Sequence, residues 1–356
     1  MTMTTKNMTI NFNDIIEILI ENIQTKSKQN LTLKQLIILR ETNKKIKVNS
    51  DNIQPFAEAE YTYTRDNHNT DNEKAIKHIL KSYKMFRLFK IISLDIYLDQ
   101  VAYTASDYID YINSVFDLIN NHKNLIHIKF TSFSFYDSHF DKFDKFEKFA
   151  KLFSQLPFLS TLELKNCIEY INDIKILTTM LPQCQVLSHL NLSCSGLKFE
   201  HIKILSVVLS ECNVLTTLDL SFNSMGPDGL KIIAEVLPQC TNLTKLDLSY
   251  NNSEDLVNFI GVPSWSTSLV HIDLNENGIG RLGDIFSQCS SLKYLNLCDN
   301  AICTKDIEET EDLREVFKQC TSIVTLHLDS NELNDDEKTN LSEMLSQYTS
   351  LKELTI

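Results

Sequence analysis

The sequence predicts an α/β solenoid, a horseshoe with parallel β-strands on its concave face and helices on its convex face. Three observations predict it. Leucine and isoleucine recur in units of about 28 residues, most regularly over residues 158–356. Within each unit the hydrophobic period changes from 2 to 3.6, as expected for one strand followed by one helix. Such a unit cannot bury its apolar side chains alone, so neighbouring units must stack.

The strand part of each unit follows the pattern Leu-x-x-Leu-x-Leu-x-x-Asn, with substitutions. The second hydrophobic position of the pattern, the anchor, recurs eight times, at Leu162, Leu190, Leu218, Leu246, Ile272, Leu295, Leu326 and Leu354. The helix part is clearest between Gly226 and Cys240, where Leu230, Ile233, Ala234 and Leu237 share one helix face.

These units resemble leucine-rich repeats of the ribonuclease-inhibitor-like type, and residues 215–240 match that pattern best. The resemblance implies a leucine-rich-repeat solenoid that binds other proteins and performs no catalysis. It implies no cofactor. Because such repeats bind many kinds of protein, the fold alone does not identify the partner.

Weaker units extend the predicted solenoid upstream, to residues 76–356. Leu94 and Ile128 have the anchor spacing. Between Phe140 and Phe149 a Phe recurs every third residue with Lys between, which predicts an amphipathic helix that packs on the solenoid or lies on a membrane surface. Residues 51–75 are rich in Asn, Asp and Thr and are predicted to be a linker or loop.

Residues 1–50 do not repeat, and their apolar spacing predicts a small helical segment. The segment resembles an F-box, a short module that docks a ubiquitin-ligase adaptor, although Asn11-Phe12 replaces the usual Leu-Pro and the late Trp is missing. That resemblance implies adaptor binding through Phe12, Ile16, Leu19 and Leu36. A plain cap over the first strand explains the same residues, and both interpretations stay open.

Composition and charge exclude several classes of function. The net charge of −13 and the pI of about 5.2 argue against nucleic-acid binding through phosphate contacts. With only 7 Gly, the chain has no glycine-rich phosphate loop. We expect an intracellular, cytoplasmic protein with no membrane partner, because no signal peptide is recognisable. The composition also resembles proteins of large amoeba-infecting viruses, which would place the chain in the host cytoplasm.

The cysteines and histidines suggest no metal or catalytic site. Five of the 9 cysteines occupy one repeat position, where the helix returns to the strand, and there Cys is expected to act as a small buried hydrophobe. No CxxC motif is present. His189, His271 and His327 are expected on the concave face, but in units too far apart to share a metal ion.

The candidate binding residues are the polar and aromatic side chains of the concave face. They are Glu163, Asn191, Asp219, Asp247, Asp273, Tyr294, Asn296 and His327. Three successive Asp residues predict an acidic stripe for a partner protein with basic charge, although a merely solvated polar face gives the same pattern. The two functional alternatives are therefore a non-enzymatic protein-binding scaffold and an F-box-type substrate receptor of a ubiquitin ligase. The oligomeric state is left open.

Overall fold

The structure of the chain is a computed structural model. It describes residues 9–10, 46–47, 58–63, 90–97, 116, 119–120, 123, 125–131, 144–168, 170–251, 257–258, 268–281, 290–302, 317 and 321–356. The chain forms two compact units, residues 1–142 with 156–159, and residues 143–155 with 160–356. Each unit is described by itself.

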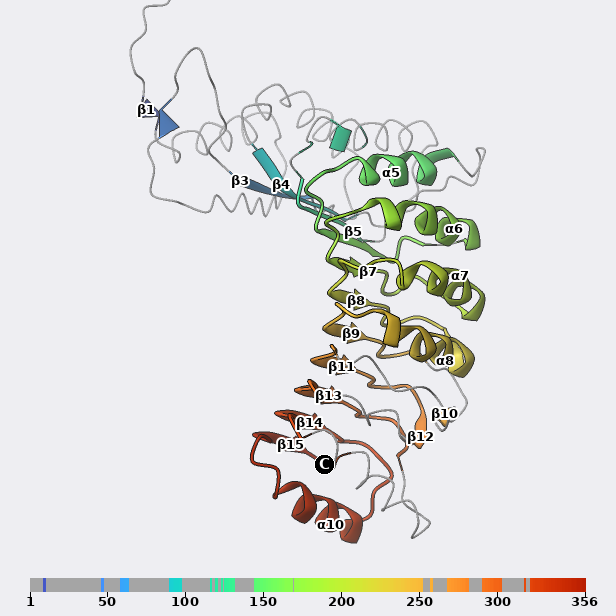
Figure 1. Cartoon of the computed structure of the whole chain (residues 1–356), viewed down its shortest axis with the longest axis vertical. Coiled ribbons are helices and arrows are strands. Elements are labelled where there is room, and N and C mark those ends of the chain that lie inside the picture. The colour runs from blue at the N-terminus through green and yellow to red at the C-terminus, as the bar shows by residue number, and fades with distance from the viewer. Residues whose placement is uncertain are drawn as a thin grey trace, which may run out of the picture. The chain divides into compact units, whose positions relative to one another are not determined.

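Eight strands of the second unit lie side by side in parallel and in sequence order (Figure 1). Each contributes three to five residues. They are β6 (Thr161–Lys165), β7 (His189–Asn191), β8 (Thr217–Asp219), β9 (Lys245–Asp247), β11 (His271–Asp273), β13 (Tyr294–Asn296), β14 (Thr325–His327) and β15 (Glu353–Thr355).

The register of these strands follows the predicted anchors. Leu190 pairs with Leu162 on one side and Leu218 on the other, and every later anchor pairs with the next, up to Leu354. The anchors from Leu162 to Leu326 are at most 1% exposed. Because side chains alternate along a strand, the residues before and after each anchor point away from this core. We call the surface that they form the strand face.

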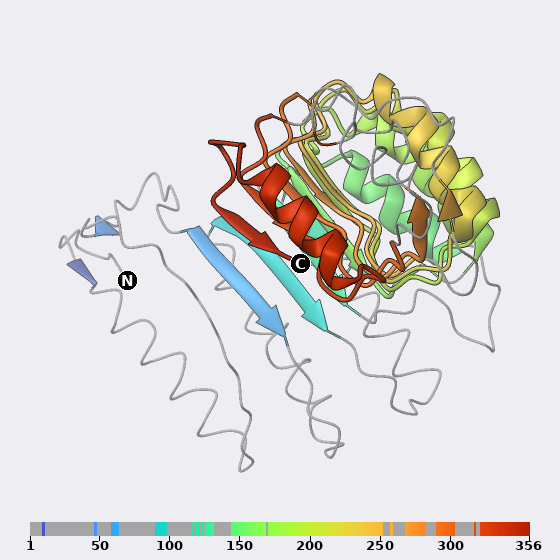
Figure 2. The same cartoon turned by 90° about the horizontal axis from the view of Figure 1, so that it is seen from below.

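The helices form a second layer on the other side of the strands. They are α5 (Asp144–Ser154), α6 (Ile171–Met180), α7 (Phe199–Leu209) and α8 (Gly226–Val236), and they stack in register with the strands (Figure 1). Viewed along the stack, these four helices lie on one side of the sheet (Figure 2). A last helix, α10 (Asp335–Leu345), precedes β15. This arrangement confirms the predicted fold class.

Helix α8 shows how the sequence sets a helix boundary. Gly226, the first residue of the helix, adopts a left-handed φ of 63°, and Pro227 fits the first turn because its missing N–H needs no partner there. The predicted face of Leu230, Ile233 and Ala234 is fully buried. A second proline, Pro238, follows, and the α-helix changes at Leu237 into a short 3-10 helix, η2 (Leu237–Gln239). The same Leu-Pro-Gln sequence forms η1 (Leu181–Gln183) after α6.

Asparagines that follow β8, β9, β11, β13 and β14 join one repeat to the next. Asn223 is 8% exposed, and its Oδ1 accepts hydrogen bonds from Ser195 N (2.9 Å) and Leu197 N (3.0 Å) of the preceding repeat. Its Nδ2 donates to Leu220 O at 2.8 Å and Leu192 O at 3.1 Å. Corresponding bonds are made by Asn277, Asn300 and Asn331. The ladder therefore satisfies backbone groups that no strand or helix pairs.

Two short strands follow Asn251 outside the main sheet. They are β10 (Val257–Asn258) and β12 (Ile279–Arg281), which pair in parallel outside the main sheet. Gly278 precedes β12 with a left-handed φ of 60°.

The first unit contains three further parallel strands, β3 (Glu58–Tyr63), β4 (Lys90–Tyr97) and β5 (His127–Thr131). The predicted anchors Leu94 and Ile128 pair with each other. Strand β3 lies inside the segment expected to be a linker, because alternating Ala59, Tyr61 and Tyr63 can pair with β4 despite the polar composition around them. The division into residues 1–50, 51–75 and 76–356 otherwise stays a prediction.

Within residues 1–50 the structure describes only β1 (Thr9–Ile10) and β2 (Ile46–Lys47), an antiparallel pair. These four residues, inside the segment predicted to be helical, are thus strand residues. The predicted adaptor-binding residues lie outside the described residues, and they are Phe12, Ile16, Leu19 and Leu36.

We expect Asn223→Ala to lower the free energy of unfolding by about 3 kcal/mol, because buried backbone groups left without a partner cost about 1–3 kcal/mol each. Urea unfolding followed by circular dichroism measures the change. Asn213→Ala is the control, since Asn213 is exposed in a loop, and it should change the stability by less than about 0.5 kcal/mol. An equal loss of unfolding free energy in the two variants would contradict a stabilising role for the asparagine ladder.

Candidate functional site

The strand face carries two columns of side chains, one before and one after the anchors. The second column contains seven of the predicted binding residues, each aligned with its neighbour by the strand register. They are Glu163, Asn191, Asp219, Asp247, Asp273, Asn296 and His327. Tyr294, the eighth, lies in the first column between His271 and Thr325. Neighbouring side chains of a column are about 4.8 Å apart along the sheet.

The Asp and Asn side chains of the second column also shape the end of each strand. Asp219 Oδ1 accepts a hydrogen bond from Ser221 N at 2.9 Å, and Asp247 Oδ1 accepts one from Ser249 N at 3.0 Å. Asn191 and Asn296 use Oδ1 in the same way, at 2.8 and 3.1 Å. Because Asn serves as well as Asp in this turn, the fold does not require the negative charge.

Asp247 differs from the two carboxylates beside it. Asp219 Oδ2 accepts a hydrogen bond from Asn191 Nδ2 (2.7 Å), and Asp273 Oδ2 accepts one from Asn296 Nδ2 (3.2 Å). Within the described part of the chain, Asp247 Oδ2 receives none. Burial raises the pKa of Asp247, the neighbouring carboxylates of Asp219 and Asp273 raise it further, and the hydrogen bonds from Ser249 oppose the shift.

An aromatic cluster continues the strand face toward β15. The rings of His271 and Tyr294 stack with centroids 4.0 Å apart, and His327 meets Tyr294 edge-on at 5.6 Å. His327 Nδ1 also lies 3.0 Å from Thr355 Oγ1. Burial lowers the pKa of His271, with Lys245 acting in the same direction and Asp273 against it. Burial, then Asp273, raises the pKa of Tyr294.

Two aromatic residues beside the acidic column were not among the predicted binding residues. The rings of Phe222 and Tyr250 stack with centroids 4.2 Å apart and an angle of 9° between planes. Phe222 is 52% exposed and Tyr250 38%. Both have left-handed backbone, with φ of 53° and 56°. The sequence did contain a signal, since each occupies the position before the ladder asparagine and the two are one 28-residue period apart.

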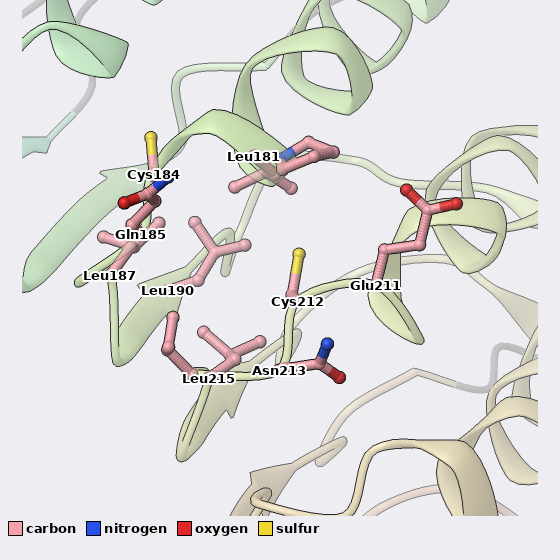
Figure 3. A pocket seen from close by; sticks show the side chains of 11 residues that line it. Leu181, Cys184, Gln185, Leu187, Leu190, Glu211, Cys212, Asn213 and Leu215 are labelled. Carbon is pink, nitrogen blue, oxygen red and sulfur yellow. The ribbon is translucent and has the colours of Figure 1, made fainter.

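A pocket of about 190 Å³ lies on another part of the unit, where two helix-to-strand loops meet (Figure 3). Leu187, Leu190 and Leu215 line it, together with the thiols of Cys184 and Cys212. Cys184 is buried, as predicted, whereas Cys212 and Cys240 are half-buried. Burial raises the pKa of each of these three thiols to about 11. All three are therefore protonated and poorly nucleophilic near neutral pH.

The described residues contain no cluster of three or more His, Cys, Asp or Glu side chains that could hold a metal ion. In the same part of the chain, no helix combines the length and the hydrophobicity that a membrane crossing needs. The six cysteines that the structure describes, Cys167, Cys184, Cys194, Cys212, Cys240 and Cys298, form no disulfide.

Iodoacetamide should modify Cys184, Cys212 and Cys240 of the native chain far more slowly than it modifies glutathione at pH 8, because the thiolate is the reacting form. Their rates should keep rising until the pH reaches about 11. Folding raises the pKa of each thiol, so the protonated thiols contribute to the stability of the folded chain. This contribution is complete at a pH below the thiol pKa of the unfolded chain, and it is lost as the pH rises through the thiol pKa of the folded chain. Mass spectrometry of alkylated peptides measures the rates, with urea-unfolded chain as control. Equal native and unfolded rates would refute burial of the thiols.

Comparison with known proteins bears on the fold. The family described as Leucine Rich repeat matches residues 211–234 and 239–252. The structure is similar to that of an internalin (inlF) from Listeria monocytogenes, with a TM-score of 0.44, 16% identity, and coverage of 80% of this chain and 88% of that chain. It is also similar to that of leiomodin-1 actin-binding site 2, with a TM-score of 0.29, 14% identity, and coverage of 58% and 88%.

The sequence matches no curated protein. The assignment therefore rests on the matched repeats, on the strand register and on the helices that cover one side of the sheet. Together these features identify the fold as an α/β leucine-rich-repeat solenoid.

Proposed function

We propose that the chain is a non-enzymatic scaffold that binds a partner protein through the strand face. One observation carries the proposal. Consecutive strands present a regular row of accessible polar and aromatic side chains on a backbone that the asparagine ladder holds rigid. Such a row is preorganised, so little conformational entropy is lost on binding. Its length, several strands at about 4.8 Å each, suits an extended protein surface better than a small substrate.

The polar groups of the row support binding more than catalysis. A general base requires a pocket that positions a substrate and excludes water. Asp219 and Asp273 are instead held by two sets of hydrogen bonds each, to a turn and to a neighbouring asparagine. Tyr294, stacked on His271, is an aromatic side chain of the kind that dominates the binding energy of interfaces.

Charge supports a partner with a basic surface. The acidic column lies on a chain of net charge −13, so a positively charged partner would be attracted and oriented during association. We propose an intracellular location, in which the described cysteines, which form no disulfide, would stay reduced.

The alternative, a substrate receptor of a ubiquitin ligase, depends on residues 11–45, outside the described residues. Under this alternative Ile16 and Leu19 contact an adaptor, and the strand face holds the substrate. Ile16→Asp and Leu19→Asp should then abolish adaptor co-purification without changing the melting temperature. Failure of the unaltered chain to bind an adaptor, with a large drop in melting for Leu19→Asp, would leave a plain cap.

We expect the double variant Thr217→Arg/Tyr294→Ala to capture partner proteins about ten-fold less or worse. It adds bulk to the centre of the strand face and removes an aromatic side chain that would contribute binding energy. Both side chains lie in the first column and make no turn hydrogen bond. Proximity labelling with quantitative mass spectrometry in the native cell measures the loss.

The matched control is Glu235→Arg/Val207→Ala. It also adds one arginine and removes one apolar side chain, but at exposed positions on α8 and α7. This control should retain the same partners, and both variants should melt like the unaltered chain. Partners that disappear with the helix-side control and persist with the strand-face variant would sink the proposal.

A further inference from the structure

A second row of side chains runs along the edge of the strand face, just before the ladder asparagines. Its central members are Phe222, Tyr250, Glu276 and Asp299, all exposed and all with left-handed φ between 53° and 56°. Backbone bonds fix their order, because Phe222 N donates to Ser249 O (2.9 Å), Tyr250 N to Asn275 O (2.8 Å) and Glu276 N to Cys298 O (3.1 Å). We call these four residues the edge row.

The aromatic half of the edge row, Phe222 and Tyr250, is exposed to solvent. The two residues of this stacked Phe–Tyr pair are each more than a third exposed, so the pair leaves apolar area in water that a ligand can contact. The fold does not need aromatic residues here, since the same position holds Cys194 and Ser330 in other repeats with φ of 56° and 57°.

The acidic half of the edge row sets the charge of the ligand. Glu276 follows Tyr250 at the next strand position and Asp299 follows Glu276, so carboxylates adjoin the aromatic stack. Asp247, with one oxygen unpaired in the described residues, lies three residues before Tyr250, at most about 11 Å between Cα atoms. Lys245 is the one lysine or arginine within β8, β9, β11 and β13, which also carry Asp219, Asp247 and Asp273, so these strands have a net negative charge.

We infer that the edge row and Asp247 bind an arginine-containing basic segment of the partner protein. This inference rests on the proposed function and specifies the chemistry that the partner presents. A planar guanidinium can stack on an aromatic face and at the same time form paired hydrogen bonds with a carboxylate. The ammonium of lysine is a compact, strongly hydrated charge and gains less from such a surface. A segment running across the strands meets the aromatic stack first and then the carboxylates.

Binding of two fluorescent peptides to the full chain tests the inference. One peptide alternates glycine with arginine, and the other alternates glycine with lysine at equal charge. The arginine peptide should bind more tightly, and Phe222→Leu/Tyr250→Leu should weaken it by about ten-fold, or about 1.4 kcal/mol, while erasing its advantage over the lysine peptide. Leucine keeps an apolar side chain, so the change isolates the rings.

A charge variant tests the carboxylates. Asp247→Asn/Glu276→Gln/Asp299→Asn should weaken both peptides and reduce the dependence of their affinity on salt. Asparagine already forms the turn at Asn191 and the left-handed backbone at Asn166, so the fold should tolerate these changes. The matched control, Glu147→Gln/Glu211→Gln/Glu235→Gln, removes three exposed charges outside the strand face and should leave both affinities unchanged.

The outcomes separate this inference from the proposed function. Equal binding of the two peptides, no effect of Phe222→Leu/Tyr250→Leu, or equal losses for the charge variant and its control would overturn the arginine site. If partner capture in the cell still depended on Thr217 and Tyr294, the scaffold function would stand without it. Loss of that dependence, with arginine-peptide binding still sensitive to the aromatic pair, would overturn the scaffold face and support the arginine site.

Discussion

The need to satisfy buried backbone groups between strand and helix governs this structure. Each of these strands has only three residues. In the chain between strand and helix some backbone groups, such as Ser195 N and Leu197 N, bond to a side chain of the next repeat. The side chain of Asn223 supplies both acceptor and donor there, accepting from a residue 28 positions earlier and donating to one 31 positions earlier. A buried polar group without a partner is costly. The spacing of the asparagines therefore fixes the spacing of the strands, and with it the alignment of every side chain on the strand face.

Most of the second unit could be predicted because its determinants are local and repeated. A buried leucine at every anchor leaves a period in the sequence, and strand alternation then places Asp219, Asp247 and Asp273 in one column. The exposed stacking of Phe222 and Tyr250 was harder to predict, because it depends on the left-handed backbone at that position. Strand β3 was missed because its pairing with β4 is non-local, while its surroundings have the composition of a loop.

The acidic column shows how one residue type serves the fold and recognition together. One oxygen of Asp247 holds the turn through Ser249, and the other receives no hydrogen bond from the described residues. Asn191 and Asn296 perform the first task alone. The fold therefore tolerates the charge of the three Asp residues but does not need it. The three carboxylates repel one another, and burial together with this repulsion raises the pKa of Asp247. Repulsion of this kind is relieved when a cation binds.

The left-handed position three residues after each second-column residue, from Asn166 to Ser330, has one further consequence. Asn, Cys, Phe, Tyr, Glu, Asp and Ser all occupy it with φ between 53° and 57°. The backbone there is held by bonds between main-chain atoms, so folding depends little on which side chain occupies the position. Mutations along this row can alter which molecules are recognised without an accompanying stability deficit. The binding specificity of the solenoid can therefore be changed, by evolution or by design, through substitutions at this position in one repeat at a time.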